Sequence, residues 1–270
     1  MILTGQITGI NGDPHIVSWD GLKFDCQAAG EFITVTSLED PTFKIQERFS
    51  EASSNAGAQA TVSTGVAVKD LSKPVIQVST PKTGQSALNM VGGCPIDFYV
   101  NGTASTFGID LSSSNVLVKV VNERITIEHT DTSLSVDVTV QTSDTFGCLF
   151  MVEIYLPATF RSGETILGLL GTPNGDSSDE WRRPNGTTIS APSTEDEKIF
   201  GTAYDYCVEN WCIDISANSM FTYGTGESFA DISKCDLPYD PTIENLVKNP
   251  PPELAAVCGN NLAWSVFCLR

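Results

Sequence analysis

The central part of the chain alternates apolar and polar residues with the period of a β-strand. Between residues 31 and 156, β-branched and aromatic side chains recur at alternate positions, and turn residues interrupt them roughly every eight to twelve positions. The pattern predicts strands at residues 31–37, 42–49, 60–68, 75–79, 96–100, 116–121, 125–129, 134–140 and 149–156. Because no helical periodicity separates them, we expect an all-β fold, an antiparallel β-sandwich with long loops.

The pattern changes after residue 156. A polar segment rich in Gly, Asn, Asp and Ser covers residues 171–193, and aromatic residues then mix with closely spaced cysteines at 204–235. Two stretches near the end, 243–247 and 253–257, are compatible with short helices, and consecutive prolines at 250–252 separate them. We therefore expect a small, cysteine-rich and partly helical C-terminal appendix.

Charge and hydropathy restrict the partners of the chain. The formal net charge of −18 repels nucleic-acid phosphates and anionic lipids and attracts cations, which makes nucleic acid an improbable partner. No apolar run approaches the roughly 20 residues needed to span a bilayer, so we expect no membrane insertion. Residues 1–10 do not resemble a signal peptide, which favours a mature form or a fragment of a larger protein.

The cysteines indicate an oxidising compartment. There are eight, with no CxxC pair and two histidines, which argues against zinc and for disulfides: Cys26, Cys94, Cys148, Cys207, Cys212, Cys235, Cys258 and Cys268. Eight cysteines allow about 105 pairings, among which Cys207–Cys212 and Cys258–Cys268 are the local ones. Glycosylation sequons begin at Asn101 and Asn185, so we expect a secreted, extracellular glycoprotein.

Two motifs contain residues suited to metal chemistry. The first is Gly12-Asp13-Pro14-His15, followed by Trp19-Asp20-Gly21-Leu22-Lys23-Phe24, in which Asp20-Gly21 presents a carboxylate from a turn. The second covers residues 168–180 and has oxygen donors at Asn174, Asp176, Asp179 and Glu180, which suit calcium. It lacks the twelve-residue loop of an EF-hand. The alternative is an acidic surface loop whose composition alone clusters these residues.

The two motifs, in this order and at this separation, resemble the von Willebrand factor type D family over roughly residues 8–200. That family begins with Gly-Asp-Pro-His and an Asp-Gly-x-x-Phe turn, and it later contains a Gly-Leu-Cys-Gly-Asn-Phe-Asn-Gly-Asp loop. The later loop is matched at Gly168, Leu169, Gly171, Asn174, Gly175 and Asp176. The resemblance implies a type D domain at 8–200, with residues 201–270 as a cysteine-rich extension packed on it.

Membership in this family implies a calcium site that joins the two motifs. Its ligands are expected to be Asp20, Thr172, Asn174, Asp176 through its main-chain oxygen, Asp179 and Glu180. The sequence departs from the family pattern twice, with Leu170 where a cysteine is usual and Thr172 where a ligating asparagine is usual. One disulfide is therefore missing, and a threonine hydroxyl replaces one ligand.

The resemblance also raises self-cleavage, because some mucin-like relatives break the bond that corresponds to Asp13–Pro14 under mild acid. The Asp13 carboxylate would attack its own carbonyl while His15 supplies or holds the proton. The structural alternative is a rigid turn in which Asp13 and His15 form local hydrogen bonds.

No sequence pattern indicates another catalytic site, and we expect a protein that is not an enzyme. His129 lies on an alternating strand, which favours a half-buried or sheet-surface position. Aromatic residues at 204, 206, 211, 221 and 223 favour packing under a disulfide-fastened loop over a ligand platform.

Three functions therefore stand as hypotheses. The first is a calcium-binding module of an adhesive, gel-forming or matrix protein that acts in assembly or adhesion, with other extracellular proteins or copies of itself as partners. The others are an autoproteolytic module that cleaves at Asp13–Pro14 and a carbohydrate-binding β-sandwich.

Overall fold

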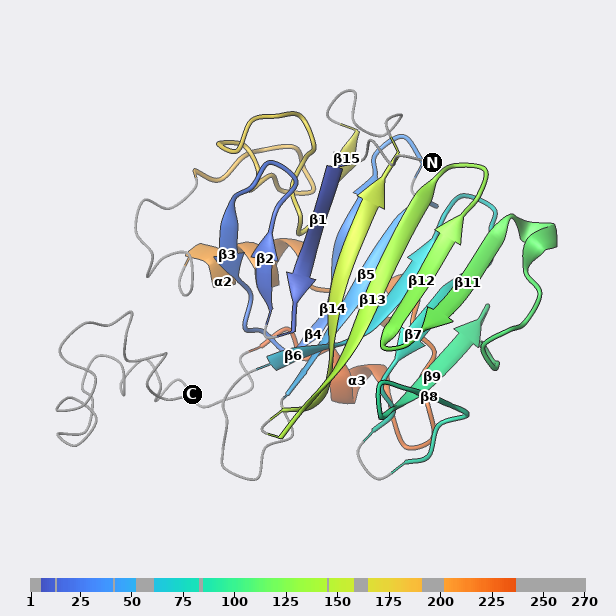
Figure 1. The fold of residues 1–270 in the computed structure, drawn as a ribbon. Coiled ribbons are helices and arrows are strands. Elements are labelled where there is room, and N and C mark those ends of the chain that lie inside the picture. Colours follow the sequence, from blue (N-terminus) through green and yellow to red (C-terminus); the bar gives the residue numbers. More distant parts are fainter. Residues whose placement is uncertain are drawn as a thin grey trace, which may run out of the picture.

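The computed structural model describes residues 6–12, 14–40, 42–51, 61–82, 85–144, 146–157, 165–190 and 202–236. Two antiparallel β-sheets pack face to face, which confirms the expected all-β sandwich (Figure 1). The predicted helical stretches at 243–247 and 253–257, together with Cys258 and Cys268, lie outside the described residues. Within the described part of the chain, no helix has the length and apolar character needed to cross a membrane.

The first sheet has seven strands in the order β11-β12-β13-β14-β1-β2-β3. Their bounds are β11 (Val116–Val121), β12 (Arg124–His129), β13 (Leu134–Ser143), β14 (Gly147–Leu156), β1 (Gln6–Asn11), β2 (His15–Val17) and β3 (Lys23–Asp25). The long hairpin of β13 and β14 keeps its register from Ser135 opposite Tyr155 to Ser143 opposite Gly147. This hairpin lies at the centre of the sheet. Strand β1 pairs with it on one side and with the β2–β3 hairpin, which contains the first motif, on the other.

The second sheet has eight strands, of which seven follow the order β10-β9-β7-β6-β5-β4-β15, and β8 pairs with β9 beside this path. Their bounds are β10 (Thr103–Ala104), β9 (Cys94–Val100), β8 (Asn89–Val91), β7 (Ile76–Ser79), β6 (Thr61–Lys69), β5 (Lys44–Glu51), β4 (Gly30–Ser37) and β15 (Ile166–Leu167). The short strand β15 pairs with the end of β4 and leads into the second motif.

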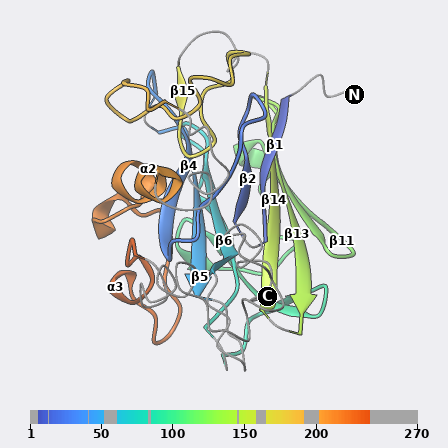
Figure 2. The same ribbon diagram turned by 90° about the vertical axis from the view of Figure 1, so that its left-hand side faces the viewer.

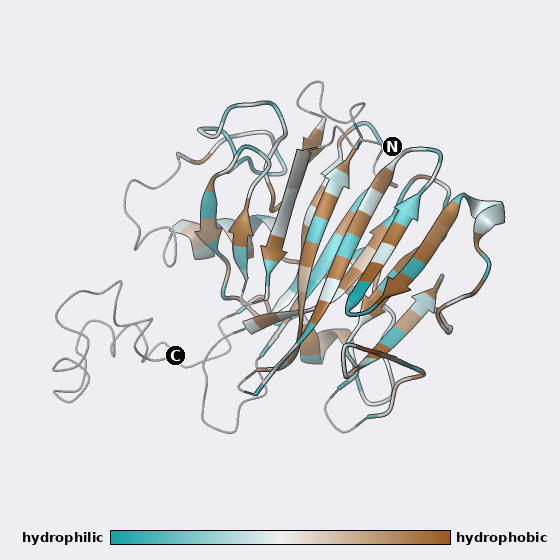
Figure 3. Ribbon diagram, in the orientation of Figure 1, coloured by the Kyte–Doolittle hydropathy of each residue, from teal (hydrophilic) through white to brown (hydrophobic). Residues whose placement is uncertain are grey.

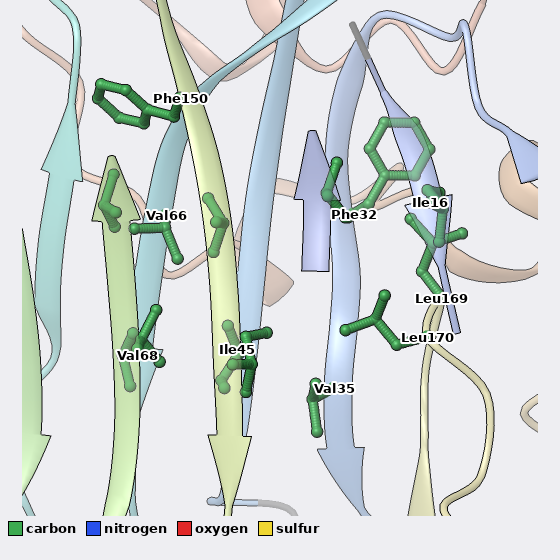
Figure 4. Packing of buried hydrophobic residues seen from close by; sticks show 14 of the residues in the cluster. Ile16, Phe32, Val35, Ile45, Val66, Val68, Phe150, Leu169 and Leu170 are labelled. Atoms are coloured by element: carbon green, nitrogen blue, oxygen red, sulfur yellow. The ribbon is translucent and has the colours of Figure 1, made fainter. Parts of the chain in front are cut away.

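The hydrophobic core lies between the sheets. Apolar and polar bands alternate along the strands, as expected for strands whose two faces meet different surroundings (Figure 3). Phe150 of β14 and Val66 and Val68 of β6 point into the shared interior, and all three are fully buried (Figure 4). Burying side chains of this size stabilises the fold by about 1.5–3 kcal/mol each. Leu170, which stands where the family usually has a cysteine, packs in the same core.

Residues 202–236 form a third layer, which we call the covering segment. It contains α2 (Thr202–Tyr206), the π-helical η3 (Cys207–Trp211), η4 (Ser216–Asn218) and α3 (Phe229–Ile232). Figure 2 shows α2 and α3 beside β4 and β5, on the side of the second sheet that faces away from the first sheet. The expected partly helical appendix is thereby confirmed. Ordering this segment costs conformational entropy, which its contacts with the second sheet offset.

Two glutamines of the second sheet bind the main chain of the covering segment. The Gln46 amide donates to Asn218 O at 2.8 Å and accepts from Met220 N at 2.7 Å. The Gln77 amide donates to Thr222 O at 3.0 Å and accepts from Thr222 N at 2.7 Å. Each side-chain amide thus makes the pair of hydrogen bonds that a neighbouring strand would make.

A buried ion pair lies beside these glutamines. Arg48 donates to Glu31 Oε1 at 3.0 Å, and both side chains are almost completely excluded from solvent. The guanidinium group of Arg48 stacks over the rings of Phe221 and Tyr223, at 4.4 and 5.3 Å from their centroids. Burial raises the pKa of the Tyr223 hydroxyl, which donates to Glu31. This part of the sheet's outer face is therefore polar yet buried.

Two disulfides are present among the described residues. Cys94–Cys148 joins β9 to β14 and so connects the two sheets, whereas Cys212–Cys235 closes the covering segment into a loop. The local pairing Cys207–Cys212 is wrong, because Cys212 bonds to Cys235. The chain turns back on itself after η3, and this places Cys235 rather than Cys207 beside Cys212.

The structure also corrects the expected position of His129, which is fully buried. Its Nδ1 lies 2.9 Å from Asp70 Oδ2, and the same oxygen accepts from Lys73 at 2.6 Å and from Thr132 at 2.7 Å. Asp70 follows β6 and His129 ends β12, so this cluster connects the two sheets at one end. A buried imidazole is tolerated there because a carboxylate is its partner.

Candidate metal centre

The first motif places Asp20 at the tip of the β2–β3 hairpin. Ser18 N and Leu22 O are hydrogen-bonded across the turn at 2.9 Å, and the Ser18 hydroxyl accepts from Leu22 N at 2.9 Å. Gly21 occupies the left-handed region with φ of +87°, which favours glycine. The turn is therefore tight, and Asp20 projects from a rigid support.

The second motif passes close to other groups at two of its glycines. A Cβ on Gly168 would lie 2.2 Å from Thr34 O, and one on Gly171 would collide with the Glu180 carboxylate. Both residues also have positive φ angles, +145° and +79°. Glycine at these positions lets the loop lie against β4 while folding back over its own acidic end.

The structure brings the two motifs together. Asp20 Oδ2 accepts from the main-chain N–H groups of Asn174 at 3.1 Å, Gly175 at 2.7 Å and Asp176 at 3.1 Å. The main chain of Trp19 also donates to Leu170 O at 3.0 Å. The Asp20 carboxylate thus caps a loop that lies more than 150 positions away in the sequence.

The side chains of the second motif also bind one another. Asn174 accepts from Asp176 N at 2.8 Å and donates to Asp179 Oδ2 at 2.8 Å. Asp176 accepts from the main chain and hydroxyl of Ser178, which lowers the pKa of the Asp176 carboxyl. The Asp176 side chain is therefore engaged locally, which is consistent with its expected use of a main-chain oxygen.

Glu180 connects the two motifs through a buried carboxylate. Its carboxylate is buried and accepts from the Ser18 hydroxyl at 2.7 Å, from Asp20 N and from Thr172 N at 2.8 Å. Burial, with a smaller contribution from the charge of Asp20, raises the pKa of Glu180 to about 7, against the effect of these hydrogen bonds. Glu180 therefore fastens the loop to the hairpin through three donors.

The oxygen donors at this site fit calcium in their chemical type. Asp179 Oδ1 and Thr172 Oγ1 are buried and have no hydrogen-bond partner, which is costly for polar atoms unless a further group binds them. Carboxylate, amide, hydroxyl and main-chain oxygens are the ligands that calcium takes. Among the described residues, however, no three His, Cys, Asp or Glu side chains come together in an arrangement that could hold a metal ion.

Three aromatic rings support the loop. Trp181 stacks on Tyr206 with centroids 5.2 Å apart, and Phe24 meets both rings edge-on. The Tyr206 hydroxyl lies within hydrogen-bonding distance of Gly168 O, at 3.0 Å, and Glu180 O, at 3.2 Å. Sequence reasoning missed this supporting role of Tyr206. The signal available was Phe24 and Trp181, one at the end of the first motif and one directly after the second.

The remaining aromatic residues do not form an open platform. Tyr206, Trp211 and Phe221 are buried, and the rings of Phe221 and Tyr223 contact Arg48. These rings pack within the covering segment and beneath it, which is the arrangement that the sequence favoured.

The residues expected for self-cleavage are described only in part. Asp13 lies outside the described residues. Pro14 O accepts from Cys26 N at 3.1 Å, and His15 Nδ1 lies 2.7 Å from Asp25 Oδ1. His15 and Asp25 are opposite each other in the β2–β3 ladder, so the imidazole has a partner within the sheet.

These features of the fold and the site define a class of protein. It is a disulfide-bonded β-sandwich module in which two loops meet to form a candidate metal site. A family model for the von Willebrand factor type D domain matches residues 9–187, and the chain belongs to this family. Such domains are typically non-enzymatic modules of extracellular adhesive or matrix proteins. The family match ends before the covering segment begins.

The chain is also similar to Sushi domain-containing protein 2 of Homo sapiens. The two are 25% identical over 261 residues, which cover 93% of this chain and 29% of that protein. The chain therefore spans less than a third of the length of this relative.

Proposed function

We propose that the chain is a calcium-stabilised, non-enzymatic module that acts in the assembly or adhesion of a larger extracellular protein. The observation that carries this proposal is the contact of the Asp20 carboxylate with the main chain of residues 174–176, which joins the turn of the first motif to the loop of the second. A loop fixed in this way offers a rigid surface to a partner.

Calcium would be held by Asp20, Asn174, Asp179, the hydroxyl of Thr172 and the main-chain oxygen of Asp176. The ion supplies positive charge and coordination to oxygen, which stabilise a loop crowded with carboxylates. Glu180 contributes most through its hydrogen bonds, since its oxygens already accept from Ser18, Asp20 and Thr172. The chain's own residues thus hold the loop in place and position its oxygen donors.

An extracellular location is supported by the family and by the two disulfides. Both sequon asparagines, Asn101 and Asn185, are exposed, which suits a glycoprotein. The partners we propose are other extracellular proteins or further copies of this chain. Self-cleavage at Asp13–Pro14 and carbohydrate binding stay predictions without a structural observation in their favour.

Calcium binding is tested by the melting temperature of the protein in calcium and in chelator. Calcium at about a hundred times its dissociation constant stabilises a folded protein by about 2.7 kcal/mol, or roughly 5–10 °C for a domain of this size. Asp20→Asn and Asp179→Asn should abolish this rise, because each removes a carboxylate while keeping its shape. Glu153→Gln, on the outer face of the first sheet, should keep it. A wild-type melting temperature that ignores both calcium and chelator would contradict the proposal.

A further inference from the structure

Two buried cysteines lie beside Phe24 and Tyr206, which support the candidate metal centre. Cys26 and Cys207 are the cysteines without a disulfide among the described residues, and neither side chain is exposed. Cys26 directly follows β3, and Cys207 is the first residue of η3. The side chains of the two residues are in hydrogen-bonding contact. Thiols buried separately behave as small apolar groups, whereas two thiols in contact are positioned to react.

The backbone on both sides of this pair is held in place. Cys26 N donates to Pro14 O at 3.1 Å, and Cys207 O accepts from Cys212 N at 3.0 Å. The ring of Phe24, two positions before Cys26, packs against Tyr206, the residue before Cys207. The two cysteines are therefore held near each other by ordered elements on both sides.

We propose that Cys26 and Cys207 form a third disulfide, which covalently joins the first motif to the covering segment. A bond forms between the two Sγ atoms, and the two electrons pass to a disulfide oxidant such as oxidised glutathione. The S–S bond of the oxidant breaks, and its sulfur atoms take up the two protons to leave as thiols. An oxidising compartment, which the other two disulfides indicate, supplies such oxidants.

The bond would fix the support of the candidate metal centre. Tyr206 adjoins Cys207, and its hydroxyl contacts the carbonyls of Gly168 and Glu180 at the two ends of the second motif. A link from Cys207 to Cys26 therefore holds Tyr206 under the loop. This consequence for calcium rests on the proposed function, whereas the disulfide itself does not.

Burial also determines when the bond can form. Desolvation raises the pKa of the Cys207 thiol, so very little of the reactive thiolate exists once the covering segment is closed. The disulfide should therefore form while the segment is still open during folding. After closure, oxidant and reductant alike should have slow access to it.

Disulfide mapping tests the bond directly. The full chain, made in an oxidising compartment, is unfolded in denaturant with an alkylating reagent and no reductant, then digested and analysed by mass spectrometry. We expect a peptide pair linked through Cys26 and Cys207. Alkylation of both residues, or their linkage to Cys258 or Cys268, would overturn the proposal. Neither result depends on calcium.

Alanine variants provide a second, energetic test. If the bond exists, Cys26→Ala and Cys207→Ala each remove it completely, so each lowers the melting temperature by on the order of 5–10 °C, and the double variant loses little more. Losses in the double variant that equal the sum of the single ones would contradict the bond.

The calcium dissociation constant of the double variant should rise by roughly fivefold, the lower end of coupling between sites. The variant Cys94→Ala/Cys148→Ala, which removes the disulfide between β9 and β14, should change it less. If wild-type protein shows no calcium-dependent change at all, the proposed function fails, while the mapping still decides the disulfide.

Discussion

The outer faces of the two sheets have different surroundings. In β11 of the first sheet, exposed or half-exposed residues follow Val116, the buried first residue, and the outward-facing side chains meet solvent. In β6 of the second sheet, every residue except the last is buried, because the core lies on one side and the covering segment on the other. Both sheets have polar residues on their outer faces. On the second sheet, the outward-facing side chains of Gln46, Arg48 and Gln77 contact the covering segment instead of solvent.

The same kinds of ion pair therefore have different energies on the two faces. Lys119 and Glu128 on the first sheet are 3.1 Å apart, with about half and more than a third of their side chains exposed. Such surface pairs are worth about 0–1 kcal/mol. The pair of Arg48 and Glu31 is buried, so removing one member leaves the other as an uncompensated charge. What covers a face thus matters more than which residues it contains.

The largest effect should follow from removing the cover. A chain that ends at residue 187, where the family match ends, would expose Gln46, Gln77 and the Arg48–Glu31 pair at once. We expect it to lose its cooperative thermal transition, measured by circular dichroism. A chain that ends at residue 236 is the matched control and should keep a cooperative transition. Equal cooperativity in both chains would show that the cover is dispensable.

The next effect concerns the buried charge. Arg48→Met should lower the free energy of unfolding by about 3–5 kcal/mol, because it leaves the Glu31 carboxylate buried without its partner. Arg124→Met, on the open face of the first sheet, should lower it by at most about 1 kcal/mol. Urea denaturation measures both. Similar losses in the two variants would remove the distinction between the faces.

A third prediction concerns pH and the cluster that joins the ends of the sheets. Hydrogen bonds from His129, Lys73 and Thr132 overcome the effect of burial and lower the pKa of Asp70 to about 2 from its ordinary value of 3.8. Asp70 therefore contributes about 2 kcal/mol above pH 4, which is lost as the pH falls toward 2. Asp70→Asn should be less stable than wild type at pH 6, and the gap should close near pH 2. A gap that stays constant over this range would refute the assignment.

The glutamines taken singly should have effects comparable to that of Asp70. Gln46→Leu and Gln77→Leu should each lower the free energy of unfolding by about 1–3 kcal/mol, because main-chain groups of the covering segment are left unpaired and buried. Gln141→Leu, at an exposed position of β13, should change it by less than about 0.5 kcal/mol. Chemical denaturation of the three variants, side by side, measures the difference.

Strands of four or more residues could be predicted from the sequence, with the exception of β1, whereas the strands of two or three residues could not. Strands β4 to β7, β9 and β11 to β14 lie within a few residues of the alternating segments. Strand β1 contains Gly9, which is placed so close to Val152 O that no Cβ would fit. Strands β2, β3 and β15 are too short for a periodic signal. Their neighbours in the fold determine them.

The site was predictable only where local patterns determine it. Turn chemistry identified Asp20 and the acidic loop, and the structure brings these together. The roles of Glu180 and Tyr206 depend on partners far away in the sequence, such as Ser18 and Gly168. The extension was expected to pack on the sandwich, but its contacts were not predicted, because Gln46 and Arg48 at alternate positions of a strand look like solvent-facing residues.

The two glutamine amides affect which amino-acid substitutions the covering segment tolerates during evolution. The hydrogen bonds of Gln46 and Gln77 to the covering segment go to main-chain N–H and C=O groups of Asn218, Met220 and Thr222, and every residue type except proline has both groups. These hydrogen bonds therefore depend on the backbone path of the covering segment and not on the identity of its side chains at these positions. Substitutions other than proline at positions 218, 220 and 222 therefore preserve these hydrogen bonds. The covering segment can acquire new binding specificities while it stays attached to the sheet.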